Sequence, residues 1–588
     1  MRRSIDTHKH SALTWIHDNR TDLFVLLLFI ALACIYWYPL PLYLRTGQLE
    51  DPIIDTAFNQ WIIGWGNHAL TYYPWRFFEA NMFYPFAHTL AWGDNLFAIT
   101  LFAVPLIPLF GLVGAYNILF LLSTALSGFT AYLLTHHLTK QRSVAIIAGV
   151  MWGLTAMRIE ELGHIQILAL QWVPLVFLFA ELVRTDYRRR YLVGFVISAF
   201  LVLTTNIYLA LFTVICFTVY GLVLLTMGKL SWLTVTLLSV GWLAAGLLAL
   251  PLYLPSIMLQ IRHPVVRGLE YQVAAGLHGY LPWPWPGQWL REMATQLGQP
   301  ITDPRANQTL GLLTYVFALL GFIRLWLERK SWRDAVVPLA FLTFGMVAIF
   351  ASTGPVTFWH EQLVANPNLI FSVLYNYFPG FDALRIPARL SFFGLLGLVV
   401  FGAWGATIVV KRLTIRTQYL LVVVAILWIM VEQMPSPVRV TKGYDIANYP
   451  SYAWLAKQPG EFPILELPIV PMGEGNRPHD TMEAKRMFLS TYHWKRRISG
   501  SISPYRNPDY IVNAELLNAI GDNPQAIKLL QEWKVKYVLY YPQDVIQLGW
   551  GTELAAKLQK RLEAIPELKQ IKTFPEAIIY SVEESYAR

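Results

Sequence analysis

Cysteine is nearly absent from this chain: only Cys34 and Cys216 occur among 588 residues. Both lie inside hydrophobic runs, far apart in the sequence, and no Cys or His spacing typical of a metal site accompanies them. A disulfide framework and a structural zinc site are therefore both disfavoured.

Charged residues are also scarce. They make up 14% of the chain, against about a quarter of an average soluble domain. Hydrophobic residues make up 55%, and the mean hydropathy is +0.43. Several Leu-, Val- and Phe-rich runs reach the roughly 20 residues that a helix needs to cross a hydrocarbon core of about 30 Å. The composition predicts a polytopic α-helical membrane protein.

The interiors of these runs contain essentially no acidic or basic residue. Ion-coupled transporters and proton pumps need such groups near mid-membrane, so the absence disfavours both classes. The net charge of +9 could indicate a nucleic-acid partner, but the Lys and Arg residues lie mostly at the ends of the runs. There they set the orientation of the protein in the membrane, so we expect no nucleic-acid partner. Because the interiors of the spans lack charged groups, we place any chemistry at the outer face.

Eleven transmembrane helices are predicted. They run near residues 23–44, 115–138, 143–157, 165–184, 191–205, 207–227, 231–254, 310–327, 334–351, 388–410 and 418–434. The apolar piece 95–112, broken by Pro105 and Pro108, decides the parity. If it is a half-buried element on the outer side rather than a span, every short basic loop is cytoplasmic, as the positive-inside rule requires.

On this topology the protein lies in the cytoplasmic membrane, with residues 1–22 inside as the polar end of a retained signal anchor. Residues 23–434 form the membrane domain, with long outer loops at 45–112, 255–309 and 352–387. Loops of this length are more often functional than idle. From Pro435 onward, strand-like and helical runs alternate, which predicts that residues 435–588 form an extracytoplasmic α/β domain.

The stretch from Leu49 to Asp94 combines two acids, an amphipathic helix and many aromatic residues. Its apolar and polar residues fall on opposite sides of a helical wheel, so we expect the helix to lie along the bilayer surface with one face toward lipid. Asp51 precedes Pro52, which is also the pattern of a simple helix N-cap. Asp55 lies one turn later, where plain solvation is the alternative to a catalytic role.

A second acidic site is predicted in the turn between the third and fourth spans. Glu160, Glu161 and His164 are close together there and could face Asp51 across the mouth of the bundle, or even ligate a divalent ion. The alternative is that these charges only cap the ends of spans.

Four arginines in the predicted outer loops run against the positive-inside bias: Arg262, Arg267, Arg385 and Arg389. A guanidinium group binds phosphate in a bidentate manner and stays charged in a partly apolar site, so these residues are candidates for binding a phosphate. Pairing with a nearby carboxylate or a lipid headgroup is the alternative. His493 with Lys495, Arg496 and Arg497 is expected to form a solvated face.

The order of these features resembles the GT-C superfamily of integral membrane glycosyltransferases, which use polyprenyl-phosphate-linked sugars. The similar motifs are Glu50-Asp51-Pro52 with Trp61 and Trp65, Asn81-Met82-Phe83-Tyr84-Pro85, Gly163-His164-Ile165-Gln166 with Gln171-Trp172-Val173-Pro174, Arg385-Ile386-Pro387-Ala388-Arg389, and Ser490-Thr491-Tyr492-His493-Trp494. They are most similar to a bacterial branch of large membrane proteins. The resemblance implies a GT-C-like bundle with a C-terminal extracytoplasmic domain.

The resemblance also implies that Asp51 is the catalytic base, with Asp55 as the second candidate. The chain has Glu50-Asp51 where the branch usually has Gly-Asp, and it lacks the paired acids of the best-known members at an obvious spacing. Which acid acts, and whether a divalent cation takes part, stays open.

The leading hypothesis is an inverting transfer of a sugar from a polyprenyl phosphate to an acceptor hydroxyl of a glycan, lipid or protein at the outer face. The alternative is a non-catalytic lipid-handling or cell-surface biogenesis protein, a flippase or scaffold, on the same fold. Convergence of the acids and arginines on one point would favour the enzyme.

Overall fold

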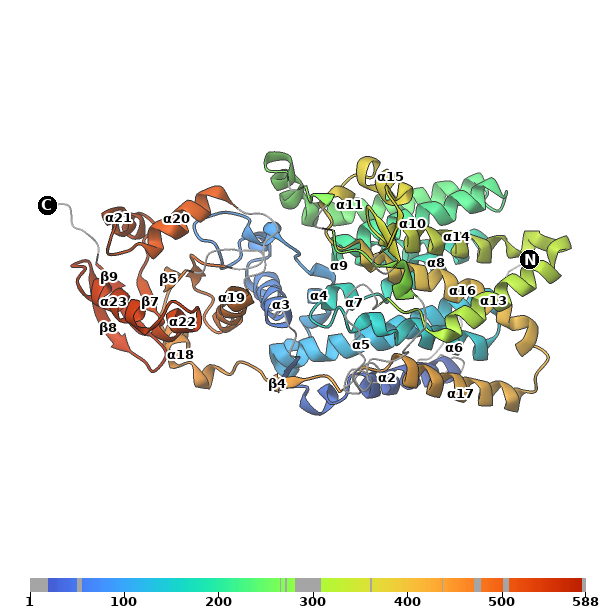
Figure 1. The fold of residues 1–588 in the computed structure, drawn as a ribbon, viewed down its shortest axis with the longest axis horizontal. Coiled ribbons are helices and arrows are strands. Elements are labelled where there is room, and N and C mark those ends of the chain that lie inside the picture. Colours follow the sequence, from blue (N-terminus) through green and yellow to red (C-terminus); the bar gives the residue numbers. More distant parts are fainter. Residues whose placement is uncertain are drawn as a thin grey trace, which may run out of the picture.

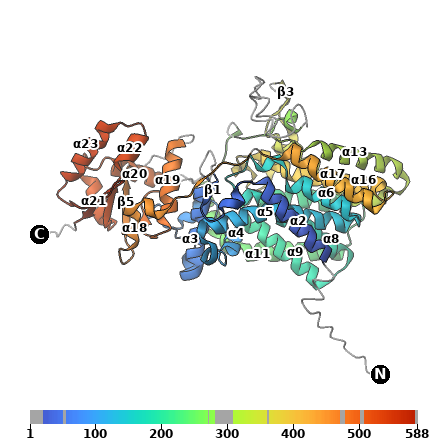
Figure 2. The same cartoon turned by 90° about the horizontal axis from the view of Figure 1, so that it is seen from below.

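The computed structural model describes residues 20–49, 55–264, 266–269, 272–280, 308–359, 362–435, 437–469, 477–500 and 507–583. Asp51 lies outside the described residues. Figure 1 shows an elongated molecule in two parts, a bundle of long helices and a smaller part that contains a sheet, with helix α3 between them. The same division is visible in the view from below (Figure 2).

The predicted spans form the bundle. Within the described residues, seven helical stretches are long and apolar enough to cross a membrane. They are α5 (Ile107–Thr139), Ile165–Thr185 with α7 (Ile165–Leu168) and α8 (Trp172–Thr185), α10 (Ile207–Thr226), α11 (Trp232–Arg262), Arg333–Ser352 with α14 (Val336–Ser352), Pro387–Val410 with α16 (Ser391–Val410), and α17 (Ile415–Gln433). The shorter helices α2 (Arg20–Tyr36), α6 (Arg142–Gly153), α9 (Arg189–Thr205) and α13 (Leu312–Leu327) occupy the other four predicted positions. The chain is thus a multi-pass α-helical membrane protein.

Several boundaries differ from the prediction. Helix α11 continues to Arg262 rather than ending near residue 254, so the first eight residues of the predicted outer loop 255–309 are helical. Helix α2 ends at Tyr36 rather than near residue 44, because Pro39 and Pro41 cannot donate a backbone hydrogen bond to a continuing helix. The piece 95–112 contains only the seven-residue helix α4 (Phe97–Ala103) and the start of α5, which bends at Gly111, where φ is +75°. Helix α4 is too short to cross the membrane, so the piece 95–112 does not form a span of its own, as expected.

Helix α16 is the centre of the bundle and is buried along nearly its whole length. It packs against α13 and α14 through glycines: a Cβ on Gly405 would lie 2.1 Å from the backbone N of Gly321, and one on Gly397 would lie 2.4 Å from the carbonyl oxygen of Phe341. Small residues at such contacts allow helix backbones to approach closely, which is how helices associate in a membrane, where lipid is as apolar as the helix surface.

Helix α3 (Asp55–Tyr72) runs across the end of the bundle (Figure 1). Every residue from Asp55 to Gly66 is buried, the polar Asn59 and Gln60 included. The expectation that one face of this helix meets lipid is therefore wrong for its first three turns. The bundle covers one side, and helix α19 (Arg477–Ser490) and the residues after it cover the other.

The C-terminal α/β domain contains a five-stranded mixed sheet. Its strands are β5 (Pro463–Leu467), β6 (Arg496–Arg497), β7 (Tyr537–Tyr540), β8 (Leu568–Thr573) and β9 (Ile578–Val582), in the order β6-β5-β7-β9-β8. Strand β5 is parallel to β6 and β7, and β9 is antiparallel to its neighbours. The helices are α18 (Pro450–Ala456), α19, α20 (Pro508–Asn518), α21 (Pro524–Glu532), α22 (Pro542–Gln547) and α23 (Thr552–Glu563). Strands β5 and β7 are fully buried, so the core of this domain lies between sheet and helices.

A small two-stranded sheet joins distant parts of the chain. Strand β1 (Gly47–Leu49), after the first span, pairs antiparallel with β4 (Val440–Lys442), just beyond the last span. The loop 352–387 contains the hairpin β2 (Thr357–Trp359) and β3 (Gln362–Ala365), followed by α15 (Leu369–Tyr377). The C-terminal domain is therefore attached to the first loop as well as to the last span.

The contact between α13 and α16 predicts that Gly405→Ala forces the two helices apart. Overpacking of this kind costs about 1–3 kcal/mol, so the variant should melt several degrees below the wild type in the same detergent. Gly246→Ala is the matched control, because a Cβ at Gly246 would meet no atom within 4 Å. Equal melting temperatures for the two variants would contradict this packing.

Candidate functional site

The first turn of α3 carries Asp55, whose residue is 8% exposed. The positive end of the helix dipole favours an acid at this position. The Asp55 carboxylate does not face open water. Its Oδ2 lies 3.1 Å from Nε2 of His164, a residue more than a hundred positions further along the chain.

His164 belongs to the turn between α6 and α7, which also carries Glu161. Nδ1 of His164 lies 3.2 Å from Oε2 of Glu161, although the angles are not those of a hydrogen bond. The side-chain amide of Asn59, on α3, donates to the carbonyl of Gly163 at 2.7 Å. Helix α3 is thus tied to this turn at the residue beside His164.

Arg389 completes the contact from a short 3-10 helix, Pro387–Leu390, that leads into α16. Its Nε and Nη2 each donate to one oxygen of Glu161 at 2.7 Å, in the bidentate geometry that guanidinium and carboxylate favour. The guanidinium also lies over the ring of Tyr208, 4.6 Å from its centroid. Of the two alternatives for Arg389, this structure displays pairing with a carboxylate.

Asp94 adds a third carboxylate. It lies just before α4, and its Oδ2 accepts a hydrogen bond of 2.5 Å from Asn206, the residue that caps the start of α10. Its carboxylate also hydrogen-bonds Gln166 and lies within electrostatic range of His164 and Arg389. Three acids, one histidine and one arginine therefore meet at the α3 end of the bundle.

The charged groups of this cluster shift the pKa values of their neighbours. Burial by itself lowers the pKa of His164, but the hydrogen bond that its imidazole donates to Asp55 and the charge of Glu161 outweigh burial, so the pKa is raised. Burial would raise the pKa of Glu161, but the charges of Arg389 and His164 overcome it and the pKa is lowered. For Asp94, burial outweighs the charges of Arg389 and His164, and its pKa is raised. Glu161 and Asp94 thus differ in acidity.

The other predicted site residues lie around this cluster. Arg385 is exposed, its backbone N–H donates to the hydroxyl of Tyr208 at 3.0 Å, and its charge lowers the pKa of Glu161. The backbone N–H of Arg267 donates to the carbonyl of Asp382, so the loops of Arg267 and Arg385 run side by side. Arg262, at the end of α11, and Glu160 are exposed.

Within the described ranges, no group of three His, Cys, Asp or Glu side chains is placed to hold a metal ion. Both oxygens of Glu161 are engaged by Arg389, so this acid is not a free ligand. The predicted divalent-ion site at Glu160, Glu161 and His164 therefore has no support from the geometry.

Asp94 and Asn206 are functional-site residues that were not predicted from the sequence. Asp94 lies directly after Gly93 and just before an apolar run, and Asp51 likewise lies close to an apolar run, the first span. An acid beside an apolar run was the feature of the sequence that could have identified Asp94. Asn206 separates two apolar runs, where a helix cap is the ordinary expectation. Only the packing of α4 against α9, together with the hydrogen bond between Asp94 and Asn206, places them beside the other acids.

No protein-family description matches the chain, and neither does any curated protein. Among solved structures, the chain is similar to the arabinofuranosyltransferase AftD from Mycobacteria, with a TM-score of 0.52 and 14% identity over 96% of this chain and 40% of that one. It also aligns with the Archaeoglobus fulgidus oligosaccharyltransferase (TM-score 0.44, 11% identity, 92% of this chain and 73% of that one) and with ArnT from Cupriavidus metallidurans (TM-score 0.38, 14% identity, 95% and 98%). The chain spans about 40% of the length of AftD, and the similarity is one of fold. The predicted GT-C-like membrane fold is confirmed.

The contact between Asp55 and His164 predicts a pH-dependent stability. The folded-state pKa of His164 is raised, so protonation of His164 stabilises the folded state. This stabilisation is fully present below the unfolded-state pKa of about 6.5 and is lost as pH rises through the folded-state pKa. Asp55→Asn should lower the pKa of His164, which histidine deuterium exchange measures. The melting-temperature gap between wild type and variant should be wider at about pH 6 than at about pH 9.

Asp186→Asn is the control, because Asp186 pairs with Arg188 just beyond α8, at the opposite end of that helix from His164. A gap that stays constant with pH in Asp55→Asn would show that Asp55 does not set the protonation of His164.

Proposed function

We propose that this chain, with its GT-C-type fold, is a membrane glycosyltransferase that moves a sugar from a polyprenyl phosphate to an acceptor hydroxyl at the outer membrane face. The observation that carries the proposal is the convergence of Asp55, Glu161, Asp94, His164 and Arg389. A lipid-handling scaffold or flippase needs no such cluster, whereas an enzyme needs its acid, base and positive charge within a few ångströms of one point. The similarity in fold to an arabinofuranosyltransferase agrees with sugar transfer.

The reaction requires a proton acceptor for the attacking hydroxyl. Glu161 is a poor candidate, because Arg389 engages both of its oxygens and its pKa is lowered. Asp55 is better placed: it lies in the first turn of α3 against the imidazole of His164, and among the described residues no arginine holds it in a bidentate pair of the kind that holds Glu161. We assign the base to Asp55 or to Asp51, which the family resemblance favours and which lies four residues before Asp55 in the sequence.

The leaving group is a phosphate, which departs without a proton, so fixed positive charge on it suffices. Arg389 is paired with Glu161. Arg385, four residues before Arg389 in the chain, is the nearest exposed arginine in the sequence. We therefore assign the donor phosphate to Arg385, with Arg267 on the neighbouring loop, and give Arg389 the role of holding Glu161. The sugar is a hexose or a pentose, and the acceptor belongs to a cell-envelope glycan, lipid or glycoprotein.

The test uses the full-length protein in nanodiscs and mass spectrometry of the lipid that copurifies with it. We expect a polyprenyl-phosphate-linked sugar in the wild type. Arg385→Gln should retain roughly ten- to a hundredfold less of it, since a hydrogen bond to a charged group is worth about 1.5–3 kcal/mol. Asp55→Asn should retain the lipid and slow its consumption by about 10² to 10⁴.

Asp186→Asn serves as the control and should match the wild type in both measurements. An active Asp55→Asn protein moves the base to Asp51 or Asp94. If Asn variants of all three acids consume the donor normally, the transferase proposal fails and the scaffold alternative takes its place.

The proposed orientation can be tested separately. The α3 end of the bundle is proposed to face outward and Lys140, at the other end of α5, to face the cytoplasm. After replacement of Cys34 and Cys216, an impermeant thiol reagent should label Lys569→Cys, on β8, and leave Lys140→Cys unlabelled in intact cells. Both native positions are exposed, so labelling reports on the side of the membrane. Labelling at position 140 but not at position 569 would show that the protein has the opposite orientation in the membrane.

A further inference from the structure

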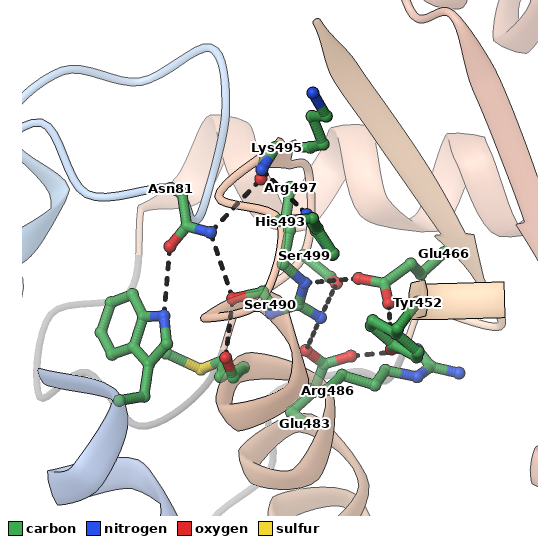
Figure 3. Close-up of polar contacts among 12 residues, drawn as sticks. Asn81, Tyr452, Glu466, Glu483, Arg486, Ser490, His493, Lys495, Arg497 and Ser499 are labelled. Carbon is green, nitrogen blue, oxygen red and sulfur yellow. Dashed lines mark hydrogen bonds and ion pairs between the residues drawn. The ribbon is translucent and has the colours of Figure 1, made fainter. Parts of the chain in front are cut away.

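Asn81 joins three separate parts of the protein (Figure 3). Its residue is 2% exposed, and its Oδ1 accepts a hydrogen bond of 3.1 Å from the indole N–H of Trp61 on α3. Its Nδ2 donates to the hydroxyl of Ser490, at the end of α19, at 3.1 Å, and to the carbonyl of Lys495 at 3.3 Å. One side chain thus connects the first loop, α3 and the C-terminal domain.

The backbone around Asn81 also joins the C-terminal sheet. The N–H of Arg497, on the edge strand β6, donates to the carbonyl of Asn81 at 3.0 Å, and the N–H of Tyr84 donates back to the carbonyl of Arg497 at 2.9 Å. The N–H of Phe83 donates to the carbonyl of Ser499 at 3.4 Å. A segment of the first loop therefore covers the open edge of the sheet, as an added strand does.

Strand β6 is held in place from its other side by buried charges. Arg497 is fully buried and donates to Glu466 on β5, to Glu483 on α19 at 3.0 Å, and to the hydroxyl of Ser499 at 3.1 Å. Arg486 bonds Glu483 at 3.1 Å and Asp544 at 2.7 Å. Figure 3 shows Arg497, Glu466 and Glu483 beside the segment that bonds Asn81.

The basic segment 493–497 was expected to be a solvated face, and that expectation is wrong for three of its members. His493 and Lys495 are each 8% exposed, and Arg497 is 0% exposed. Burial and the charges of Arg497 and Lys495 lower the pKa of His493 to about 3, so this imidazole is neutral and its Nδ1 accepts from the N–H of Lys495. Each of these polar groups shapes the turn that presents the Lys495 carbonyl to Asn81.

The same turn packs on α3. A Cβ added to Gly64 would lie 3.4 Å from Thr491 and 3.5 Å from Trp494. The Trp494 ring stacks on His68 at 4.7 Å and meets the edge of Trp65 at 5.8 Å. Since Trp61 lies six residues after Asp55, the bond to Asn81 is only about 9 Å along the helix axis from the acid cluster.

We propose that Asn81 is a positioning residue through which the C-terminal domain sets the place of α3, and hence the contact between Asp55 and His164. The C-terminal domain then completes the active site rather than merely accompanying it. The effect on sugar transfer rests on the proposed function, whereas the mechanical coupling does not.

Backbone amide exchange in the purified full-length protein tests the coupling. Asn81→Ala removes the acceptor for Trp61 and both donors to the C-terminal domain, so exchange in residues 55–66 should become roughly tenfold faster. Asn518→Ala is the matched control. Asn518 also bonds two backbone groups, the N–H and carbonyl of Ile469 at 2.8 and 2.6 Å, but within the C-terminal domain alone. It should leave residues 55–66 at the wild-type rate.

Unchanged exchange in α3 of Asn81→Ala, or an equal rise in both variants, would overturn the proposal. If Asn81→Ala does not fold, Ser490→Ala carries the test, because it removes only one of the three partners. A rise of about two- to threefold in α3 then supports the coupling, and no rise overturns it.

A second measurement separates positioning from mere stability. In a transfer assay with the copurified polyprenyl-linked sugar, Asn81→Ala should lower kcat about tenfold and change the apparent KM for that lipid less than twofold. A rise in KM at constant kcat would argue against a positioning role. If no transfer occurs even in the wild type, the proposed function fails, and the amide-exchange result still decides the coupling.

Discussion

Burial of α3 on both sides is the constraint on which the rest of the structure depends. The buried polar groups of Asn59, Trp61 and Trp65 on this helix need partners on each side, because an unpaired buried polar group costs about 1–3 kcal/mol. The bundle supplies the carbonyl of Gly163, and the first loop supplies Asn81 and the carbonyl of Phe77. The helix is therefore located in space by hydrogen bonds from elements that are distant in sequence.

The acid cluster follows from this placement. Glu161, buried beside Asp55 and Asp94, would be costly as a charge without Arg389, and Arg389 would be costly without Glu161. Their bidentate contact leaves Asp55 to His164 and Asp94 to Asn206. One ion pair thus allows three carboxylates to share a small volume. The pKa of Glu161 is lowered and that of Asp94 is raised, and such a difference is the usual condition for dividing roles among like groups.

The C-terminal domain also contains buried charges that compensate one another in ion pairs, and it contains more of them. Arg486 and Arg497 lie among Glu466, Glu483 and Asp544, with Lys485 at 3.7 Å from Asp544. Such a network contributes less to net stability than to a unique arrangement, because any shift leaves a buried charge unpaired. A rigid edge strand is what the first loop needs in order to pair with it, so we regard the network as support for that junction.

Hydrophobic run length, Pro positions and the change of composition at Pro435 were sufficient for the membrane class, the positions of eleven helices and the C-terminal α/β domain, because these properties are local in the chain. Asp55, Glu161, His164 and Arg389 could also be named from sequence, since charges in apolar surroundings stand out. Their contacts could not be predicted, nor could the role of Asp94, the double burial of α3 or the burial of Arg497. Each of these depends on which distant segment fills the space beside a polar group, and only tertiary packing decides that.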